Sequence, residues 1–357
     1  MKKPHSGTST PRFSTGKYRA LATCCLLALT PLAAHARSVP AKSRAPGCDR
    51  ACMTHIVDEV FNSMPAHDPY HLPLAPVYEA TENNHPAALG MMELWRTVTK
   101  GGKPDFLAID PIAGQAFFEK QLDEGDDLSV MWGRIKVVDR KITQLEFYIN
   151  RSRGDHGFSF SAKNLPANMA YWMHPPANRV RASRATLEKL ALASFNAADD
   201  LKVAIGPHCQ FIEAGSHVVD PGLGDPEFGP IRKDPNKPLG CMFPPFRPTD
   251  LKARVLVIDD KLGIVVTSGL VPGRVFPYPF YGHMISAFIP DDMKQAQDIQ
   301  ARWFAKAKRL GKGPLLEPAA ATGVTMQVLQ FYNGKLQGSQ IDVHLGGSGI
   351  RSNWVKY

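Results

Sequence analysis

Three polar side chains that can do acid/base or metal chemistry lie close together in one glycine-bounded segment. Glu213, His217 and Asp220 occur in FIEAGSHVVDPGLG. An imidazole beside carboxylates can act as a general base, and the same groups can ligate a metal. Their spacing matches no standard zinc signature, so we predict no metal site. Polar loop residues are often simply solvated, which leaves a functional role and a solvated role both open.

A second candidate region is rich in aromatic residues and prolines. It begins VPGRVFPYPFYGHMISAFIP, and we interpret it as a largely non-helical loop. Long ordered loops often contact ligands or cover a site, although the same aromatic side chains can anchor a packed corner. Tyr281 can donate to a developing oxyanion, and His283 can move a proton. The ligand-contacting candidates of the segment are Phe276, Tyr278 and Phe280.

Two predicted strands alternate polar and apolar side chains. Because side chains of a strand point to opposite faces in turn, Asp342 and His344 share one face, as do Glu146, Tyr148 and Asn150. One side of an antiparallel sheet can face water, and we predict that these polar rows are exposed to solvent. The alternative is that the later row lines the mouth of a pocket, with Asp342 orienting His344.

These candidates belong to a chain that repeats itself. FLAIDPIAG resembles VLVIDDKLG, and further pairs of segments follow in the same order. In both segments the aspartate begins a hairpin turn that a glycine ends, so we interpret Asp110 and Asp259 as turn residues. The spacing between the copies grows along the chain, which indicates insertions near 225–250 and 268–323.

Each copy has the same expected order of elements. Apolar residues at helical spacing predict an amphipathic helix after CDR, followed by a short strand and a short helix. Four strands joined by turn signals then predict an antiparallel meander, at 105–110, 114–121, 128–138 and 142–150 in the first copy. Helices followed by a meander favour an α+β fold over a parallel doubly wound sheet. A further amphipathic helix after Asp292 is expected to dock the second insertion on its sheet.

This pattern of helix, TEN-type strand, short helix and curved meander resembles the NTF2-like, SnoaL-like or ketosteroid-isomerase-like superfamily, here in tandem. The resemblance covers about 48–150 and 183–350. It implies two cone-shaped domains, each with helices packed on a curved antiparallel sheet, whose two sheets pack together as in the dimers of single-cone relatives. Superfamily members include isomerases, dehydratases, cyclases and non-catalytic binders, so the resemblance leaves the reaction open. Glu82 and Trp95 lie near the expected mouth of the first cone, where ligand contact and core packing are both open.

The N-terminus has the layout of a secretory signal peptide, with basic residues, an apolar run and AHA at its end. We expect a signal peptide at 1–36, a flexible N-terminus at 37–47, domains at 48–151 and 183–357, and a linker at 152–182. The signal carries five of the 42 basic residues and none of the 33 acidic ones, so its removal lowers the net charge from +9 to +4. This disfavours nucleic acid as a partner. The apolar run is too short for stable membrane insertion.

Four cysteines lie outside the expected signal peptide. In an oxidising compartment we expect them to pair locally, Cys48 with Cys52 and Cys209 with Cys241. No partner spacing supports the alternative of a metal site. The chain is therefore predicted to be periplasmic or secreted.

Together these features suggest an exported enzyme of the lyase, dehydratase or isomerase type, which acts on a small apolar or aromatic molecule without a cofactor. His283 or His344 would move the proton, and Asp342 or Glu213 would orient that base. The alternative is a non-catalytic periplasmic ligand-binding or scaffold protein, to which His217 and Asp220 would contribute ligand contacts. The sequence leaves the oligomeric state, including a homo-oligomer, open.

Overall fold

The computed structural model describes residues 47–152, 159–195, 201–218, 240–243, 253–280, 283–311 and 316–355, with the backbone alone at 278–280 and 283–285. All of them lie in one compact unit, Arg44–Tyr357. The expected signal peptide at 1–36 and most of the insertion near 225–250 lie outside the described residues. In the part of the chain that is described, no helix has the length and apolar character needed to cross a membrane.

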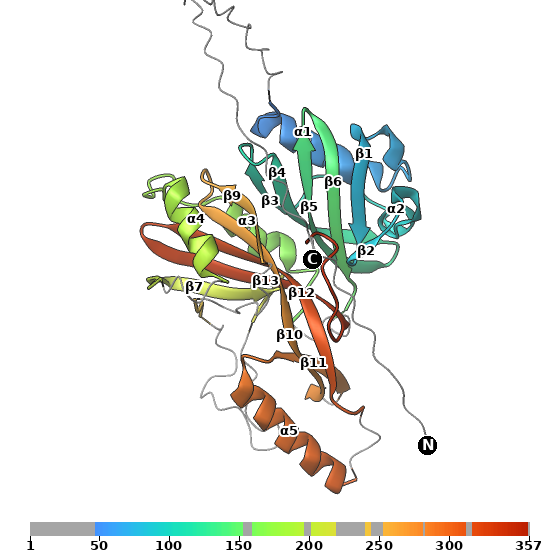
Figure 1. Ribbon diagram of the computed structural model, residues 1–357, viewed down its shortest axis with the longest axis vertical. Helices are drawn as coiled ribbons and strands as arrows, with labels where there is room; N and C mark the ends of the chain where they lie inside the picture. The colour runs from blue at the N-terminus through green and yellow to red at the C-terminus, as the bar shows by residue number, and fades with distance from the viewer. Residues whose placement is uncertain are drawn as a thin grey trace, which may run out of the picture. The chain divides into compact units, whose positions relative to one another are not determined.

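The first sheet has six strands in the order β2-β1-β6-β5-β4-β3 (Figure 1). Its strands are β1 (Leu74–Glu82), β2 (His85–Pro86), β3 (Phe106–Asp110), β4 (Gln115–Glu124), β5 (Asp127–Val138) and β6 (Lys141–Asn150). β1 runs parallel to β6, and the other neighbours are antiparallel. The strands predicted at 105–110, 114–121, 128–138 and 142–150 correspond to β3 to β6.

Helix α1 (Arg50–Ser63) covers one face of the first sheet. Asp49 caps it by accepting from the backbone N–H of Cys52 at 2.9 Å. Its buried residues Val57 and Phe61 share an apolar cluster with Phe118 and Phe147 of the sheet. The short elements η1 (Pro69–His71), η2 (Leu89–Met91) and α2 (Leu94–Thr97) complete this half.

The second sheet has the order β11-β10-β12-β13-β7-β8, and β9 pairs with β10 beside this path. Its strands are β7 (Ile205–Glu213), β8 (Ser216–His217), β9 (Arg254–Asp259), β10 (Ile264–Phe280), β11 (His283–Pro290), β12 (Ala319–Tyr332) and β13 (Lys335–Gly347). Helix α4 (Arg184–Ala193) packs on it through Leu187 and Leu190, as α1 packs on the first sheet. The mixture of helices and largely antiparallel sheets confirms the α+β class.

The two sheets match in register as well as in strand order. Glu82 lies opposite Phe147 in the parallel pair of the first sheet, and Glu213 lies opposite Ile341 in the parallel pair of the second. The register shifts between β5 and β6 and between β12 and β13 fall at the corresponding step. The repeat read from the sequence is therefore also a repeat of strand pairing.

One apolar cluster draws on both sheets. Phe117 and Trp132 of the first sheet and Val266 and Met326 of the second belong to it, together with Trp172 of α3 (Leu165–Met173). Because strand residues alternate between faces, this is the face of the first sheet turned away from α1. The two sheets thus cover each other's otherwise exposed faces, and we call this contact the inter-sheet interface.

The predicted solvent exposure of the polar rows is wrong. Glu146, Tyr148, Asn150 and Asp342 are all buried, on the face that the apolar cluster of the inter-sheet interface occupies. The apolar residues of the same strands pack on the opposite face, as the alternation predicts. The alternation therefore separated the two faces correctly, but a second sheet rather than water covers the polar one.

Two reciprocal ion pairs join the repeats. Arg50 donates to both carboxylate oxygens of Asp259, at 2.9 and 2.7 Å, and Arg184 donates to both oxygens of Asp110, at 3.0 and 2.8 Å. Each aspartate also accepts from backbone N–H groups of its own hairpin turn, such as that of Leu262 at 3.1 Å. The turn interpretation is confirmed, and each turn aspartate in addition binds the other repeat.

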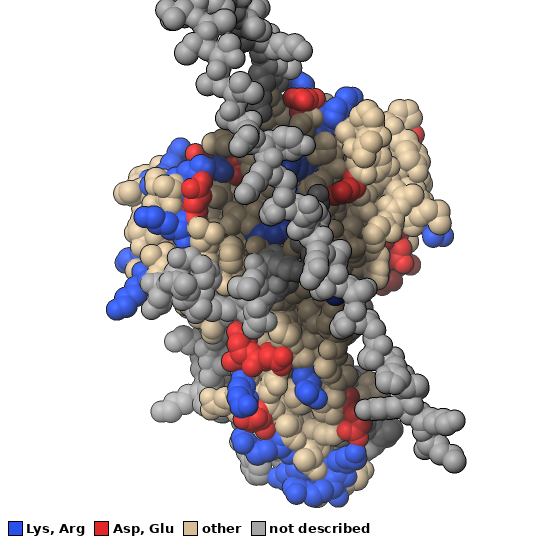
Figure 2. Space-filling view, in the orientation of Figure 1, with Lys and Arg blue, Asp and Glu red and all other residues tan. Residues whose placement is uncertain are grey.

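The aromatic segment interpreted as a loop is a β-hairpin arm, made by the end of β10 with β11. Alternating Pro and aromatic residues are compatible with extended backbone, and here the ladder continues to Phe280. Phe276 is buried with Ile289 and Ala296, so it anchors α5 (Lys294–Arg309) on the arm rather than facing a ligand. Figure 2 shows basic side chains gathered over the α5 region. Three of them in its last turn, Lys306, Lys308 and Arg309, complement the negative end of the helix dipole.

Both expected disulfides form, Cys48 with Cys52 and Cys209 with Cys241. The first closes the start of α1, and the second ties the segment at Cys241 to β7. Disulfides of this kind are typical of proteins that fold in an oxidising compartment.

Candidate functional site

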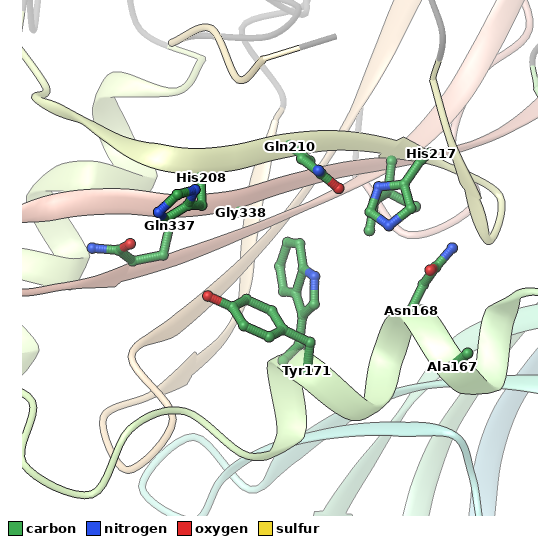
Figure 3. Close-up of a pocket in the computed structure, with 10 residues that line it drawn as sticks. Ala167, Asn168, Tyr171, His208, Gln210, His217, Gln337 and Gly338 are labelled. Atoms are coloured by element: carbon green, nitrogen blue, oxygen red, sulfur yellow. The ribbon is translucent and has the colours of Figure 1, made fainter. Parts of the chain in front are cut away.

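A cavity of about 420 Å³ lies between α3 and the edge of the second sheet formed by β7, β8 and β13 (Figure 3). We call it the α3 pocket. The helix forms one wall and the strands form the other. Its lining residues are Ala167, Asn168, Tyr171, Trp172, His208, Gln210, Ile212, His217, Gln337 and Gly338.

Helix α3 is held in place by its apolar stripe. Leu165, Met169 and Trp172 are buried in the cluster of the inter-sheet interface, at the spacing of one helical face. The residues between them, Asn168 and Tyr171, are left to face the pocket. Burial of one stripe therefore determines which side chains the helix presents to the cavity.

Two glycines let the strands approach this helix. A Cβ on Gly338 would lie 2.5 Å from the indole of Trp172, closer than any real contact. Gly215 has φ +77°, and a Cβ there would lie 2.7 Å from the carbonyl oxygen of Ser161. The carbonyl of Gly215 also accepts from the side-chain amide of Asn168 at 2.9 Å. These contacts fix the distance between the two walls of the pocket.

His217 is the group in the pocket best placed for proton transfer. Its Nδ1 is buried and has no hydrogen-bond partner among the described residues. Burial lowers the pKa of His217, so the ring is neutral at neutral pH. Figure 3 shows His217 on the strand wall and Asn168 on the facing helix. A neutral imidazole can accept one hydrogen bond from a ligand and donate another.

The rest of the lining is aromatic or neutral and polar. Tyr171 forms a hydrogen bond with Tyr332, and burial together with this bond raises the pKa of Tyr332 to about 12. The side chains of Gln210 and Gln337 supply amide donors and acceptors. None of the residues that line the α3 pocket is an aspartate, a glutamate, a lysine or an arginine. The pocket therefore suits an uncharged molecule with a flat face and a hydrogen-bonding edge.

Of the candidates named from the sequence, His217 is the one that lines this pocket. Glu213 is buried nearby on β7, and its carboxylate accepts from the backbone N–H of Ser159 at 2.8 Å. Asp220 lies outside the described residues. Of the residues grouped around Glu213 in the sequence, the Glu213 carboxylate holds the backbone at Ser159, and the imidazole of His217 lines the pocket.

Asp342 and His344 belong to the inter-sheet interface rather than to the α3 pocket. Asp342 Oδ2 accepts from the side-chain amide of Gln340 at 3.1 Å. The ring of His344 lies 5.8 Å from that of Tyr148 on the first sheet. Asp342 is fully buried under the first sheet, so it does not lie at a pocket mouth, and whether it orients His344 stays a prediction.

Glu82 and Trp95 have structural contacts in the first half. Glu82 accepts from the backbone N–H groups of Glu93 and Leu94, at 2.9 and 3.1 Å, and so caps α2. Trp95 is buried in the core, and its indole N–H donates to Ser63 Oγ at 2.9 Å. Core packing, the default for a tryptophan, accounts for Trp95.

The remaining candidates come from the aromatic segment after Phe276. Tyr281 is outside the described residues, as are the side chains of Tyr278, Phe280 and His283. Their roles stay predictions.

The four pocket residues on α3 have no counterpart among the sequence candidates, because 152–182 is interpreted there as a linker. The segment LPANMAYWM from Leu165 carries an apolar stripe at helical spacing, with a proline in its first turn. That pattern is a helix signal. It indicates the helix, but nothing in the pattern indicates which sheet edge the helix faces.

Comparisons with known proteins add little. No family model matches the chain, and no curated protein matches it. A solved structure described as a de novo designed protein with a curved β-sheet is similar to 34% of this chain and 97% of its own, at 12% identity and a TM-score of 0.25. A likeness of that size carries no argument about fold or function.

Proposed function

We propose that this chain is a ligand-binding protein whose site is the α3 pocket. The observation that carries the proposal is a cavity of about 420 Å³ whose walls are aromatic faces, two imidazoles and neutral amides. Its volume lies within the range of small-molecule sites, and sites of this kind combine apolar walls with a few placed polar groups. The ligand we propose is a small, flat, uncharged molecule with hydrogen-bonding groups along one edge.

The proposal also includes the export of the chain and its domain arrangement. The chain is an exported, periplasmic or secreted protein, and 48–151 and 183–357 are two tandem NTF2-like domains. Matching strand registers and the reciprocal Arg50–Asp259 and Arg184–Asp110 pairs support the tandem arrangement. The two disulfides support the oxidising compartment.

Binding can be tested with uncharged bicyclic heteroaromatic compounds such as indole, quinoline and coumarin, titrated into the protein by calorimetry. For a compound that binds, Tyr171→Ala and His217→Ala should each raise the Kd about tenfold, which corresponds to about 1.4 kcal/mol. Tyr70→Ala is the matched control, because Tyr70 is an exposed tyrosine that does not line the pocket. Equal Kd values in all three variants would exclude the α3 pocket as the site.

Acid/base catalysis of the lyase or isomerase type is the second candidate function, and His217 favours it. A neutral ring with a lowered pKa in a pocket can act as a general base without a cofactor. His217→Gln should then abolish turnover of a bound compound while its Kd changes little. The rate should fall as the pH drops below the lowered pKa of His217, because the protonated ring no longer accepts a proton. A pH-independent rate in this range would exclude His217 as the base.

A further inference from the structure

Two carboxyl groups from different sheets meet inside the inter-sheet interface. Glu119 lies on β4 of the first sheet and Asp342 on β13 of the second, and neither side chain is exposed to solvent. They interact directly with each other. In the first sheet Glu119 pairs with Trp132, whose ring stacks on Tyr148 at 5.5 Å. The carboxyl pair therefore lies among large buried side chains rather than at a wet edge.

The pair is short of hydrogen-bond donors. Neither oxygen of Glu119 has a donor in full hydrogen-bond geometry in the described part of the chain, although the amide of Gln340 interacts with this carboxyl group, and Asp342 Oδ1 has no donor there either. The amide of Gln340 donates to Asp342 Oδ2. Burying an ionised carboxylate without donors or a cation costs several kcal/mol. A proton placed between the two groups changes this, because a carboxyl O–H can donate to the facing carboxylate.

At the other end of the inter-sheet interface, the charge of a buried carboxylate is balanced by two arginines. Glu146 pairs with Arg134 at 2.6 Å and with Arg254 at 3.0 Å, and it accepts from the hydroxyl of Tyr148 at 3.0 Å. At the corresponding register positions of the other end, Glu146 becomes Gln340 and Tyr148 becomes Asp342. The residue that pairs with Gln340, as Arg134 pairs with Glu146, is the uncharged Val328.

The charged and titratable groups facing the pair are mostly acidic. Asp105, which precedes Asp110 by the same number of residues as Arg254 precedes Asp259, adds negative charge near Glu119. Lys120 interacts with Asp105. On β13 the nearest titratable neighbour on the same face is His344, whose ring contacts Tyr148. Within the described residues, neither member of the pair forms an ion pair with an arginine or lysine.

We propose that Glu119 and Asp342 form a protonated carboxyl pair across the inter-sheet interface, and that loss of a proton from this pair as the pH rises weakens the contact between the two sheets. This inference concerns the coupling between the repeats and is independent of the α3 pocket. No co-reactant other than water is needed, because the proton passes to solvent and the pair gains one negative charge.

The direction of the pH dependence follows from the titration of the pair. Burial raises the pKa of Asp342 to about 7, and burial together with the charge of Asp342 raises the pKa of Glu119 well above its ordinary range. The folded chain therefore holds more protons than the unfolded chain between about pH 4 and about pH 7. Stability contributed by the protonated pair is complete below this window and is lost as the pH rises through it.

The test compares urea unfolding of the full chain at about pH 5 and about pH 8. The wild type should show a lower urea midpoint at the higher pH. The double variant Glu119→Gln, Asp342→Asn should lose most of that decrease, because paired amides donate and accept without titrating. Asp126→Asn is the matched control, since Asp126 is exposed and lies outside the interface. A wild-type midpoint that does not fall, or a double variant that falls as far as the wild type, overturns the proposal.

A second measurement does not depend on how well the variants fold. Infrared spectra of the wild type should contain the carbonyl band of protonated buried carboxyl groups at about pH 5, and this band should lose intensity as the pH rises past about 7, because Asp342 ionises first. Absence of the band at both values, or a band that persists unchanged, would also overturn the proposal.

Discussion

The two ends of the inter-sheet interface occupy similar positions of the repeat, but they differ in how their buried carboxyl groups are balanced by charge. At one end Glu146 is enclosed by Arg134 and Arg254. At the other end Glu119 and Asp342 face each other without a cation. The pairing of β5 with β6 matches that of β12 with β13, but a register shift between β9 and β10 near Arg254 has no counterpart between β3 and β4. The two ends therefore differ in side chains and in one local irregularity of the strand pairing.

Two similar halves within one chain permit such a difference. In a symmetric homodimer every interface residue occurs twice, so both ends must carry the same charges. When the copies lie in one chain, each end can change separately. The Arg50–Asp259 and Arg184–Asp110 pairs have stayed equivalent, whereas the Glu146 end and the Glu119 end have diverged.

The segments that place a tryptophan against each sheet also differ between the two halves. On the second sheet, Trp172 of α3 lies over Gly338 and helps to form the α3 pocket. On the first sheet, Trp354 near the C-terminus donates to Thr81 Oγ1 at 3.1 Å and lies 4.7 Å from the guanidinium of Arg134. Helix α3 supplies a tryptophan to the second sheet, whereas the segment near the C-terminus supplies one to the first, and the α3 pocket lies beside the former.

Glu146→Gln should have the largest effect on stability. It leaves the buried Arg134 and the partly buried Arg254 without a counter-charge, and breaking such a group costs about 3–5 kcal/mol. Urea unfolding at neutral pH, followed by tryptophan fluorescence, measures the loss. Glu119→Gln, the same substitution at the opposite end, should not destabilise the chain under these conditions. Equal losses in the two variants would mean that the two ends do not differ electrostatically.

The same substitution should alter the acid side of the stability profile. Burial alone would raise the pKa of Glu146, but Arg254 and Arg134 outweigh it and hold that pKa below its ordinary value. The stability that Glu146 contributes is therefore present above the pKa of the unfolded chain and is lost as the pH falls through the folded value. Below about pH 4 the wild type and Glu146→Gln should converge. A constant difference down to low pH would contradict this assignment.

Arg50→Ala and Arg184→Ala should each reduce stability by about 2–3 kcal/mol, less than Glu146→Gln because both arginines are partly exposed. The two losses should be equal within error, since the pairs are reciprocal. Chemical denaturation of both variants checks this equality. A loss confined to one variant would show that the two pairs have diverged as well. Arg140→Ala provides a control, because Arg140 lies in an exposed turn.

Gly338→Ala should have the smallest effect, about 1–2 kcal/mol, because the new methyl group displaces the indole of Trp172. It should also reduce ligand binding in the α3 pocket more than it reduces stability. Thermal unfolding and calorimetric titration measure the two effects. Gly347→Ala, at the end of the same strand with no atom within 4 Å of the added carbon, should change neither. Full ligand affinity in Gly338→Ala would show that the indole does not shape the pocket.

Several features were predictable because they depend on neighbours in the chain. The strands of the first meander, the turn roles of Asp110 and Asp259, and the pairing of the four cysteines all follow from local spacing. His217 was named for the type of side chain and its neighbours. The hairpin arm was mistaken for a loop because prolines usually interrupt central strands, whereas here they lie where β10 extends beyond the meander as a two-stranded hairpin.

The sequence by itself determined the repeat, the order of elements and which residues share a strand face, since these follow from periodicity along the chain. Only the tertiary structure decided that the polar faces of β6 and β13 are buried, that α3 forms one wall of a pocket, and that Glu119 meets Asp342. Each of these depends on a partner more than a hundred residues away or on another sheet. Alternation separates two faces of a strand, but burial of a face depends on what packs against it.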